Sequence, residues 1–105
     1  MSLPQGTTPE IRYRFRKVTV TDIVSAYLTI RQNGRKLIER DLSSVLDVSA
    51  TDNSITWRLT QEETLEFNPN DDLEVQIKYK TSAGIVGTSV VSYVKSYEDM
   101  KGEVI

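Results

Sequence analysis

Apolar and polar side chains alternate along much of the chain, and this period of two predicts strands. The clearest case is the stretch 11–16, whose apolar and basic residues face opposite ways: Ile11, Tyr13 and Phe15 against Arg12, Arg14 and Arg16. A strand of this kind buries one face and leaves the other in water. We therefore expect the rings in a core and the three arginines in solvent.

An Asn33-Gly34 pair separates two further strand patterns, at 26–32 and 35–40. A two-residue type I′ turn needs positive φ at both central positions, which Asn and Gly tolerate best. The sequence therefore predicts a tight β-hairpin here.

A short helix is predicted directly after a strand at 55–59. Thr60 and Glu63 match a capping box, in which each side chain accepts a hydrogen bond from the other residue's backbone amide. The expected helix covers about residues 61–65.

The last two predicted strands differ in their patterns. Residues 73–80 alternate cleanly, with the apolar members on one face, whereas residues 85–95 are apolar on both faces. We expect 85–95 to be the longest strand, and either central in its sheet or covered by a partner.

Seven strands with turn signals every 8–12 residues are typical of a β-sandwich. We predict an all-β, immunoglobulin-like antiparallel sandwich of two sheets, with one short helix between strands five and six. The alternative is a five-stranded barrel of the oligonucleotide-binding type, which also carries a helix between strands. The domain is expected to cover residues 9–95, with 1–8 and 96–105 as loosely ordered tails.

Charge is unevenly distributed along the chain. Residues 1–40 carry a net charge of +5 and residues 41–105 a net charge of −7, which gives −2 overall. We take this as ordinary solvation of two polar faces. If the halves instead form two poles, copies of the chain would dock head to tail through opposite charge.

Composition argues against catalysis. The chain has no His and no Cys, so the commonest general base and the thiolate metal ligands are missing. The carboxylate pairs at 62–63 and 71–72 are better explained by helix capping and by a turn. We expect no enzymatic activity, no catalytic residue, no metal and no cofactor. No apolar run reaches the roughly 20 residues that span a bilayer.

Single-stranded nucleic acid and glycans are two ligand classes that the aromatic and basic residues could serve, besides a purely structural role. Base and aromatic residues interleave at 12–17, as in proteins that bind single-stranded nucleic acid, but alternation puts the rings and the arginines on opposite faces. A glycan site would need Trp57 exposed beside other rings, whereas its place on an apolar face predicts a core anchor. A β module that binds a glycan or single-stranded nucleic acid is therefore the alternative function.

Three segments resemble a known group of proteins: YLTIRQNG at 27–34, ITWRLTQEET at 55–64 and VQI at 75–77. They are similar to small proteins encoded among the tail genes of phages and prophages in Gram-positive bacteria. A more distant similarity is to the N-terminal β-sandwich domain of phage baseplate upper proteins. The resemblance spans about residues 9–95, and its most specific part is the run LTQEET.

The resemblance implies a structural protein of a phage tail or baseplate that acts as a protein–protein interaction module. It implies as partners tail or baseplate proteins or further copies of the chain, in the virion tail or in the host cytoplasm during assembly. From the residues we expect neither a membrane nor a nucleic acid as partner, and the resemblance carries over no catalytic residue. The candidate contact residues are the basic face of the first strand and two tyrosines near the end of the chain: Arg12, Arg14, Arg16, Tyr93 and Tyr97.

Overall fold

The computed structural model describes residues 3–69, 71–89 and 92–95. Most elements are short strands, joined by one α-helix and two 3-10 turns. In chain order they are β1 (Glu10–Arg14), η1 (Val20–Asp22), β2 (Ile23–Gln32), β3 (Arg35–Asp41), η2 (Leu42–Ser44), β4 (Asp47–Ser49), β5 (Ser54–Arg58), α1 (Gln61–Leu65), β6 (Asp72–Thr81), β7 (Val86–Thr88) and β8 (Ser92–Lys95).

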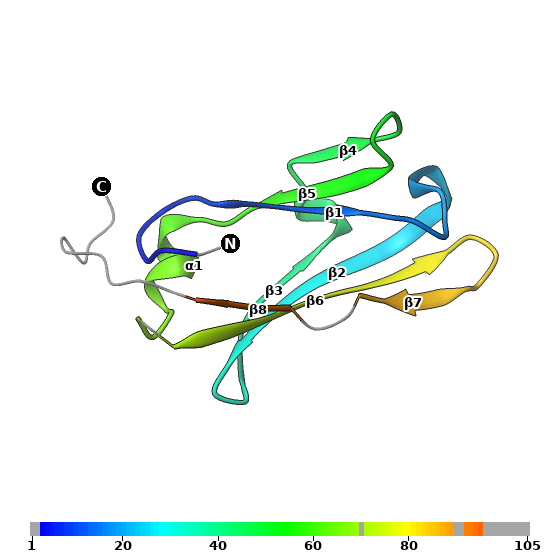
Figure 1. Ribbon diagram of the computed structural model, residues 1–105. Coiled ribbons are helices and arrows are strands. Elements are labelled where there is room, and N and C mark those ends of the chain that lie inside the picture. The colour runs from blue at the N-terminus through cyan, green and yellow to red at the C-terminus, as the bar shows by residue number, and fades with distance from the viewer. Residues whose placement is uncertain (1–2, 70, 90–91, 96–105) are drawn as a thin grey trace.

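The strands form two antiparallel sheets that lie in separate layers (Figure 1). One sheet has the order β1-β5-β4, and the other has the order β3-β2-β6 with β7 and β8 both paired to β6. The eight strands thus fill seven sheet positions, because β7 and β8 share one edge of β6. The predicted class, a two-sheet antiparallel sandwich with a helix between β5 and β6, is confirmed. The five-stranded barrel is wrong.

The strand order can be mapped onto an immunoglobulin sandwich, whose constant type has sheets ABED and CFG. β1, β5 and β4 take the places of B, E and D, while β3, β2, β6 and the β7/β8 pair take the places of C′, C, F and G. Among the described residues, no strand occupies the place of A. The outer edge of β1 is consequently without a neighbouring strand in this part of the chain, and β7, in the place of G, also ends its sheet there.

The core lies between the two layers and follows the predicted alternation. Ala26, Leu28 and Ile30 of β2 are buried, and so are Leu73 and Ile77 of β6, of which Ile77 is the register partner of Leu28. The prediction that these strands bury one face is confirmed.

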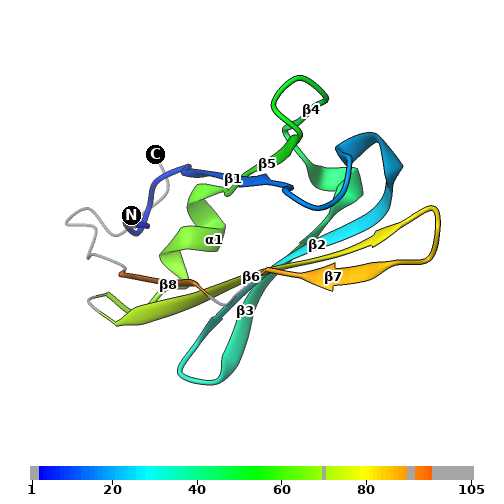
Figure 2. The ribbon, with the colours of Figure 1, turned by 45° about the vertical axis from the view of Figure 1, so that its right-hand side comes forward.

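The hairpin and the capped helix are confirmed as well. Asn33 and Gly34 have φ of 54° and 77°, the left-handed values that a type I′ turn requires. The Thr60 hydroxyl accepts from the Glu63 amide at 3.1 Å, and the Glu63 carboxylate accepts from the Thr60 amide at 2.8 Å. Figure 2 shows α1 at one end of the sandwich, between the layers.

The last strand differs from its prediction. Residues 85–95 are divided between β7 and β8, and the pairing with β6 slips by one residue between them. Near the break, the Ile77 amide donates to the Ser89 hydroxyl at 2.9 Å rather than to a backbone carbonyl. The strand also lies at a sheet edge, so the expectation of a single long strand and the option of a central one are both wrong. Apolarity on two faces misled the prediction, because Ile85 and Val86 are 57% and 56% exposed.

The N-terminal residues from Leu3 onward also differ from the expected loose tail. Leu3 is 1% exposed, and Gln5 donates to the Phe67 carbonyl at 2.6 Å. The Thr7 amide donates to the Thr64 hydroxyl at 3.1 Å. These contacts hold the segment against α1 and the loop after it, since the helix end leaves carbonyl groups that need donors.

Candidate functional site

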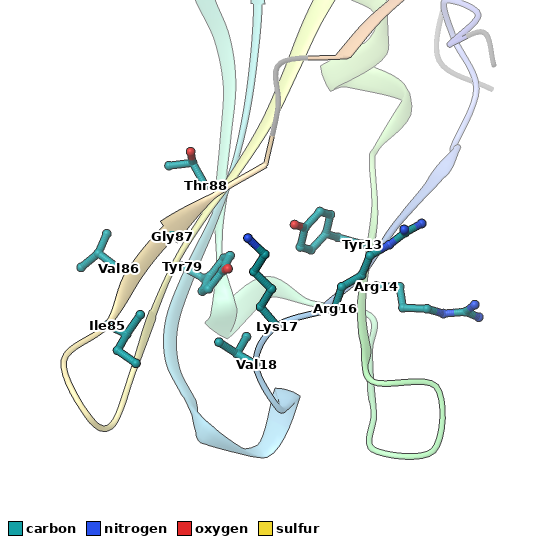
Figure 3. Close-up of a pocket in the computed structure, with 10 residues that line it drawn as sticks. All are labelled: Tyr13, Arg14, Arg16, Lys17, Val18, Tyr79, Ile85, Val86, Gly87 and Thr88. Atoms are coloured by element: carbon teal, nitrogen blue, oxygen red, sulfur yellow. The ribbon is translucent and has the colours of Figure 1, made fainter.

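A groove of about 810 Å³ opens between the edges of β1 and β7 (Figure 3). Figure 1 shows β7 at the end of the sandwich away from α1. The groove lies where one edge strand of each sheet, β1 and β7, faces the same side of the molecule. Its lining comes from β1 and the loop after it, from β6, and from β7 with the residue before it: Tyr13, Arg14, Arg16, Lys17, Val18, Tyr79, Ile85, Val86, Gly87 and Thr88.

The floor of the groove is aromatic. Phe15 is buried and packs edge-on against Tyr13 and against Tyr79, with ring centroids 4.9 and 5.0 Å apart. Edge-to-face packing at these distances is favourable for aromatic pairs. Tyr13 was predicted as a core residue, but both tyrosines are only half-buried because one side of each ring forms the groove.

The Tyr13 hydroxyl stays protonated near neutral pH. Burial raises its pKa, the neighbouring Tyr79 raises this pKa further, and the positive charge of Arg16 lowers it by less. The groove floor therefore presents a neutral hydroxyl, which both donates and accepts hydrogen bonds.

Glycine at position 87 makes room for one of these rings. A Cβ atom at position 87 would lie 2.5 Å from Cζ and from Oη of Tyr79, closer than real Cβ contacts come. Gly87 and Tyr79 are register partners on β7 and β6 and point to the same face. The absence of a side chain on β7 thus lets the Tyr79 ring lie across the strand and reach the groove.

We expect Gly87→Ala to destabilise the protein by about 1–3 kcal/mol, the usual result of overpacking. The ring of Tyr79 would have to leave its place beside Phe15 to relieve the clash. Urea denaturation followed by circular dichroism measures the loss. A double variant, Gly87→Ala with Tyr79→Leu, should be less destabilised than the sum of the two single variants, and simple additivity would contradict the proposed clash.

The rim of the groove is basic. Arg14, Arg16 and Lys17 line it, and all three are exposed. The ion pairs among the described residues are Lys36–Glu39, Arg40–Glu63 and Arg58–Glu10, so the three rim cations have no carboxylate partner in this part of the chain. In Figure 3 the Lys17 side chain extends along the groove, while Arg14 lies at its outer border.

Asn53 fixes the loop that carries Arg16 and Lys17. Its side-chain amide donates to the carbonyls of Phe15 and Val18 at 2.9 and 2.8 Å, and its side-chain oxygen accepts from the Val20 amide at 2.6 Å. Its φ of 53° is a left-handed value that asparagine tolerates better than most residues. This clamp across two segments was not predicted from the sequence.

The candidate contact residues are only partly brought together. Arg14 and Arg16 line the groove, whereas the Arg12 guanidinium donates to the Thr56 hydroxyl at 3.3 Å on the outer face of the sheet. Tyr93 belongs to β8, where it pairs with Glu74, but its side chain lies outside the described residues, and so does Tyr97. Lys17 was not singled out, although its place directly after a basic strand was a usable signal.

Other chemistry has little support in the part of the chain that the structure describes. No group of three or more potential metal-ligating residues occurs there. The same residues contain no helix with the length and apolarity needed to cross a membrane. Trp57 is 0% exposed, so it provides no surface for a sugar to stack on.

Comparisons with known proteins leave the groove as the main guide to function. No protein-family model matches the chain, and a search of curated proteins finds no match either.

Proposed function

We propose that this protein is a protein–protein interaction module of a phage or prophage tail or baseplate. Its partners are tail or baseplate proteins, met in the virion tail or in the host cytoplasm during assembly. Two independent lines support this. The resemblance in residues 27–34, 55–64 and 75–77 suggests the tail or baseplate, and the groove suggests protein binding.

The observation that carries the proposal is a combination of three features of the groove: an apolar floor, a basic rim, and the edges of two sheets. Among the described residues, the rim has no carboxylate partner and the two edges have no neighbouring strand. Exposed sheet edges are templates for pairing with another chain. Apolar surface rimmed by polar residues is typical of interaction sites. A polypeptide partner satisfies all three features at once.

A second candidate is a module for single-stranded nucleic acid or for a glycan. The groove does combine tyrosine rings with Arg16 and Lys17, the mixture that single-strand binders use. The rings, however, pack edge-on against Phe15, and the chain is acidic overall. Because Trp57 is buried, chemical shifts of the groove residues are a better probe of such ligands than tryptophan fluorescence. Saturable shifts with oligo(dT), oligo(dA) or a tail-receptor glycan would favour this candidate.

Mass spectrometry of purified tails tests the proposed setting. Tails isolated from an induced culture of the source bacterium should contain this chain in stoichiometric amount. Its presence in the culture but not in the tails would contradict a virion role. The purified tails then serve as the binding partner in the next experiment.

Charge reversal at the rim should weaken association with those tails. We expect Arg16→Glu with Lys17→Glu to lower the amount of tagged chain that cosediments with purified tails by about tenfold at low salt, because rim charges steer association. The difference should shrink at high salt, since exposed charges are screened. Arg35→Glu with Lys36→Glu, on the hairpin, is the matched control and should bind as the unmodified chain does. Equal losses from both pairs would contradict a role for the groove.

A further inference from the structure

We propose that the groove takes a short, extended, acidic segment of a partner protein, which joins the five-stranded sheet as an added strand along β7. The proposal deepens the proposed function and rests on it. It specifies the mode of binding, the edge that pairs and the chemistry of the partner.

The hydrogen-bond pattern identifies which groups of β7 are available. The Thr81 amide donates to the Ile85 carbonyl at 2.9 Å, which makes residues 81 and 85 a hydrogen-bonded pair between β6 and the start of β7. In an antiparallel ladder such pairs alternate with pairs that do not exchange hydrogen bonds. The backbone amide and carbonyl of Gly87 therefore point to β6, and those of Val86 and Thr88 point away from β6.

These outward groups have no partner among the described residues. β7 ends its sheet on that side, and no strand of the described chain pairs with it there. Each backbone group is a strong donor or acceptor, so an incoming strand can satisfy four of them at once. The edge of β1 is less suitable. Its outward-pointing backbone groups belong to Arg12 and Arg14, and charged residues on an edge strand discourage pairing.

The segment would take the position beside β7, on the side of the groove. In this chain the residues before β1 do not fill it. They run instead to α1, where Gln5 and Thr7 bond to the helix and to the loop after it. The described N-terminal residues thus leave the groove between β1 and β7 open.

Charge complementarity argues for an acidic segment. Arg14, Arg16 and Lys17 line one lip of the groove. On the other side, Lys78 and Lys80 of β6 are exposed and pair directly with Thr88 and Val86 of β7. An added strand would be separated from β6 by β7 alone. Its side chains on that outer face would therefore lie two strand positions away from these lysines.

The apolar floor of the groove determines which residue type suits every second position of the added strand. Side chains that an added strand turns inward would meet Tyr13, Tyr79 and Val18. Because successive side chains of a strand point to opposite faces, the matching sequence alternates apolar and acidic residues. The segment is short, since β7 has three residues and the register slips before β8.

Amide hydrogen exchange on the full, isotope-labelled chain tests this pairing. The probe is a capped hexapeptide, Asp-Val-Glu-Val-Asp-Val. Exchange at the Val86 and Thr88 amides should slow by about tenfold when nine-tenths of the chain is bound, by mass action. The Gly87 amide, already bonded to β6, should change far less. The same peptide with alternate backbone amides methylated, and a Lys-Val-Lys-Val-Lys-Val peptide, should not bind.

Substitution of Thr88 gives a matched pair of variants. Thr88→Pro removes the outward amide, and proline is tolerated on an edge strand where that amide faces solvent. We expect it to weaken peptide binding at least tenfold, while Thr88→Val, which keeps the amide, should weaken binding far less. Thermal unfolding and the protection of the β2 amides verify that both variants fold.

The possible outcomes separate this inference from the proposed function. Peptide binding without protection of Val86 and Thr88, or no binding at all, overturns strand addition, while loss of tail association on charge reversal at the rim would still support the interaction module. Protection that rises with chain concentration in the absence of peptide makes a second copy the occupant and overturns the separate partner. Oligo(dT) binding in the groove in place of the peptide overturns both proposals.

Discussion

Replacing Trp57 with alanine is expected to lower the free energy of unfolding by about 3–5 kcal/mol, the range for deleting a large buried aromatic side chain. Trp57 is 0% exposed on β5, at the centre of the three-stranded sheet. Its indole N–H donates to the Asp41 carbonyl at 3.0 Å, at the end of β3 in the other sheet. The residue therefore joins the two layers by packing and by a hydrogen bond.

Trp57→Phe separates these two contributions. It keeps most of the buried area and loses the indole donor, which is worth about 1 kcal/mol, plus part of the ring volume. Urea denaturation followed by far-UV circular dichroism measures both variants without relying on tryptophan fluorescence. A loss below about 1 kcal/mol for Trp57→Ala would contradict the central place given to this side chain.

Replacing Asn53 with alanine should cost about 2–4 kcal/mol, because three backbone groups at the exit of β1 lose their side-chain partners. The same change places alanine at a φ of 53°, where a Cβ atom is unfavourable. The loop with Arg16 and Lys17 should loosen, and amide exchange at Val20 should accelerate.

Asn53→Gly is the matched control for backbone strain. Glycine accepts the left-handed conformation but, like alanine, lacks the amide. The alanine variant should be less stable than the glycine variant, by about 1 kcal/mol. If the glycine variant alone regained full stability, the hydrogen bonds of the side chain would be unimportant and the clamp would be wrong.

Most of this fold could be predicted from the sequence, because short sequence patterns determine its main features. Alternation placed Ala26, Leu28 and Ile30 in the core, the Asn33-Gly34 pair placed the hairpin, and the capping box placed α1. Each depends on residues a few positions apart. These features together were sufficient for a two-sheet antiparallel sandwich.

Features that depend on long-range neighbours were not predictable in the same way. The Asn53 clamp joins residues more than thirty positions apart, and the groove depends on which strands end each sheet. Arg40 shows the same effect, since it bonds to the Glu63 carboxylate at 2.8 Å and to the Arg58 carbonyl at 3.0 Å. Alternation gives the two faces of a strand but not the identity of its neighbours.

The break between β7 and β8 has a further consequence, for aggregation. Cross-β fibrils grow when long, flat strands stack in register without interruption. Here the register shift beside Ser89 and the hydroxyl that replaces a carbonyl there interrupt the ladder after three residues. An edge of three residues can pair with one short segment, but it is too short to template a continuous stack of strands. The β7 edge is therefore open to a partner and yet poorly suited to amyloid growth.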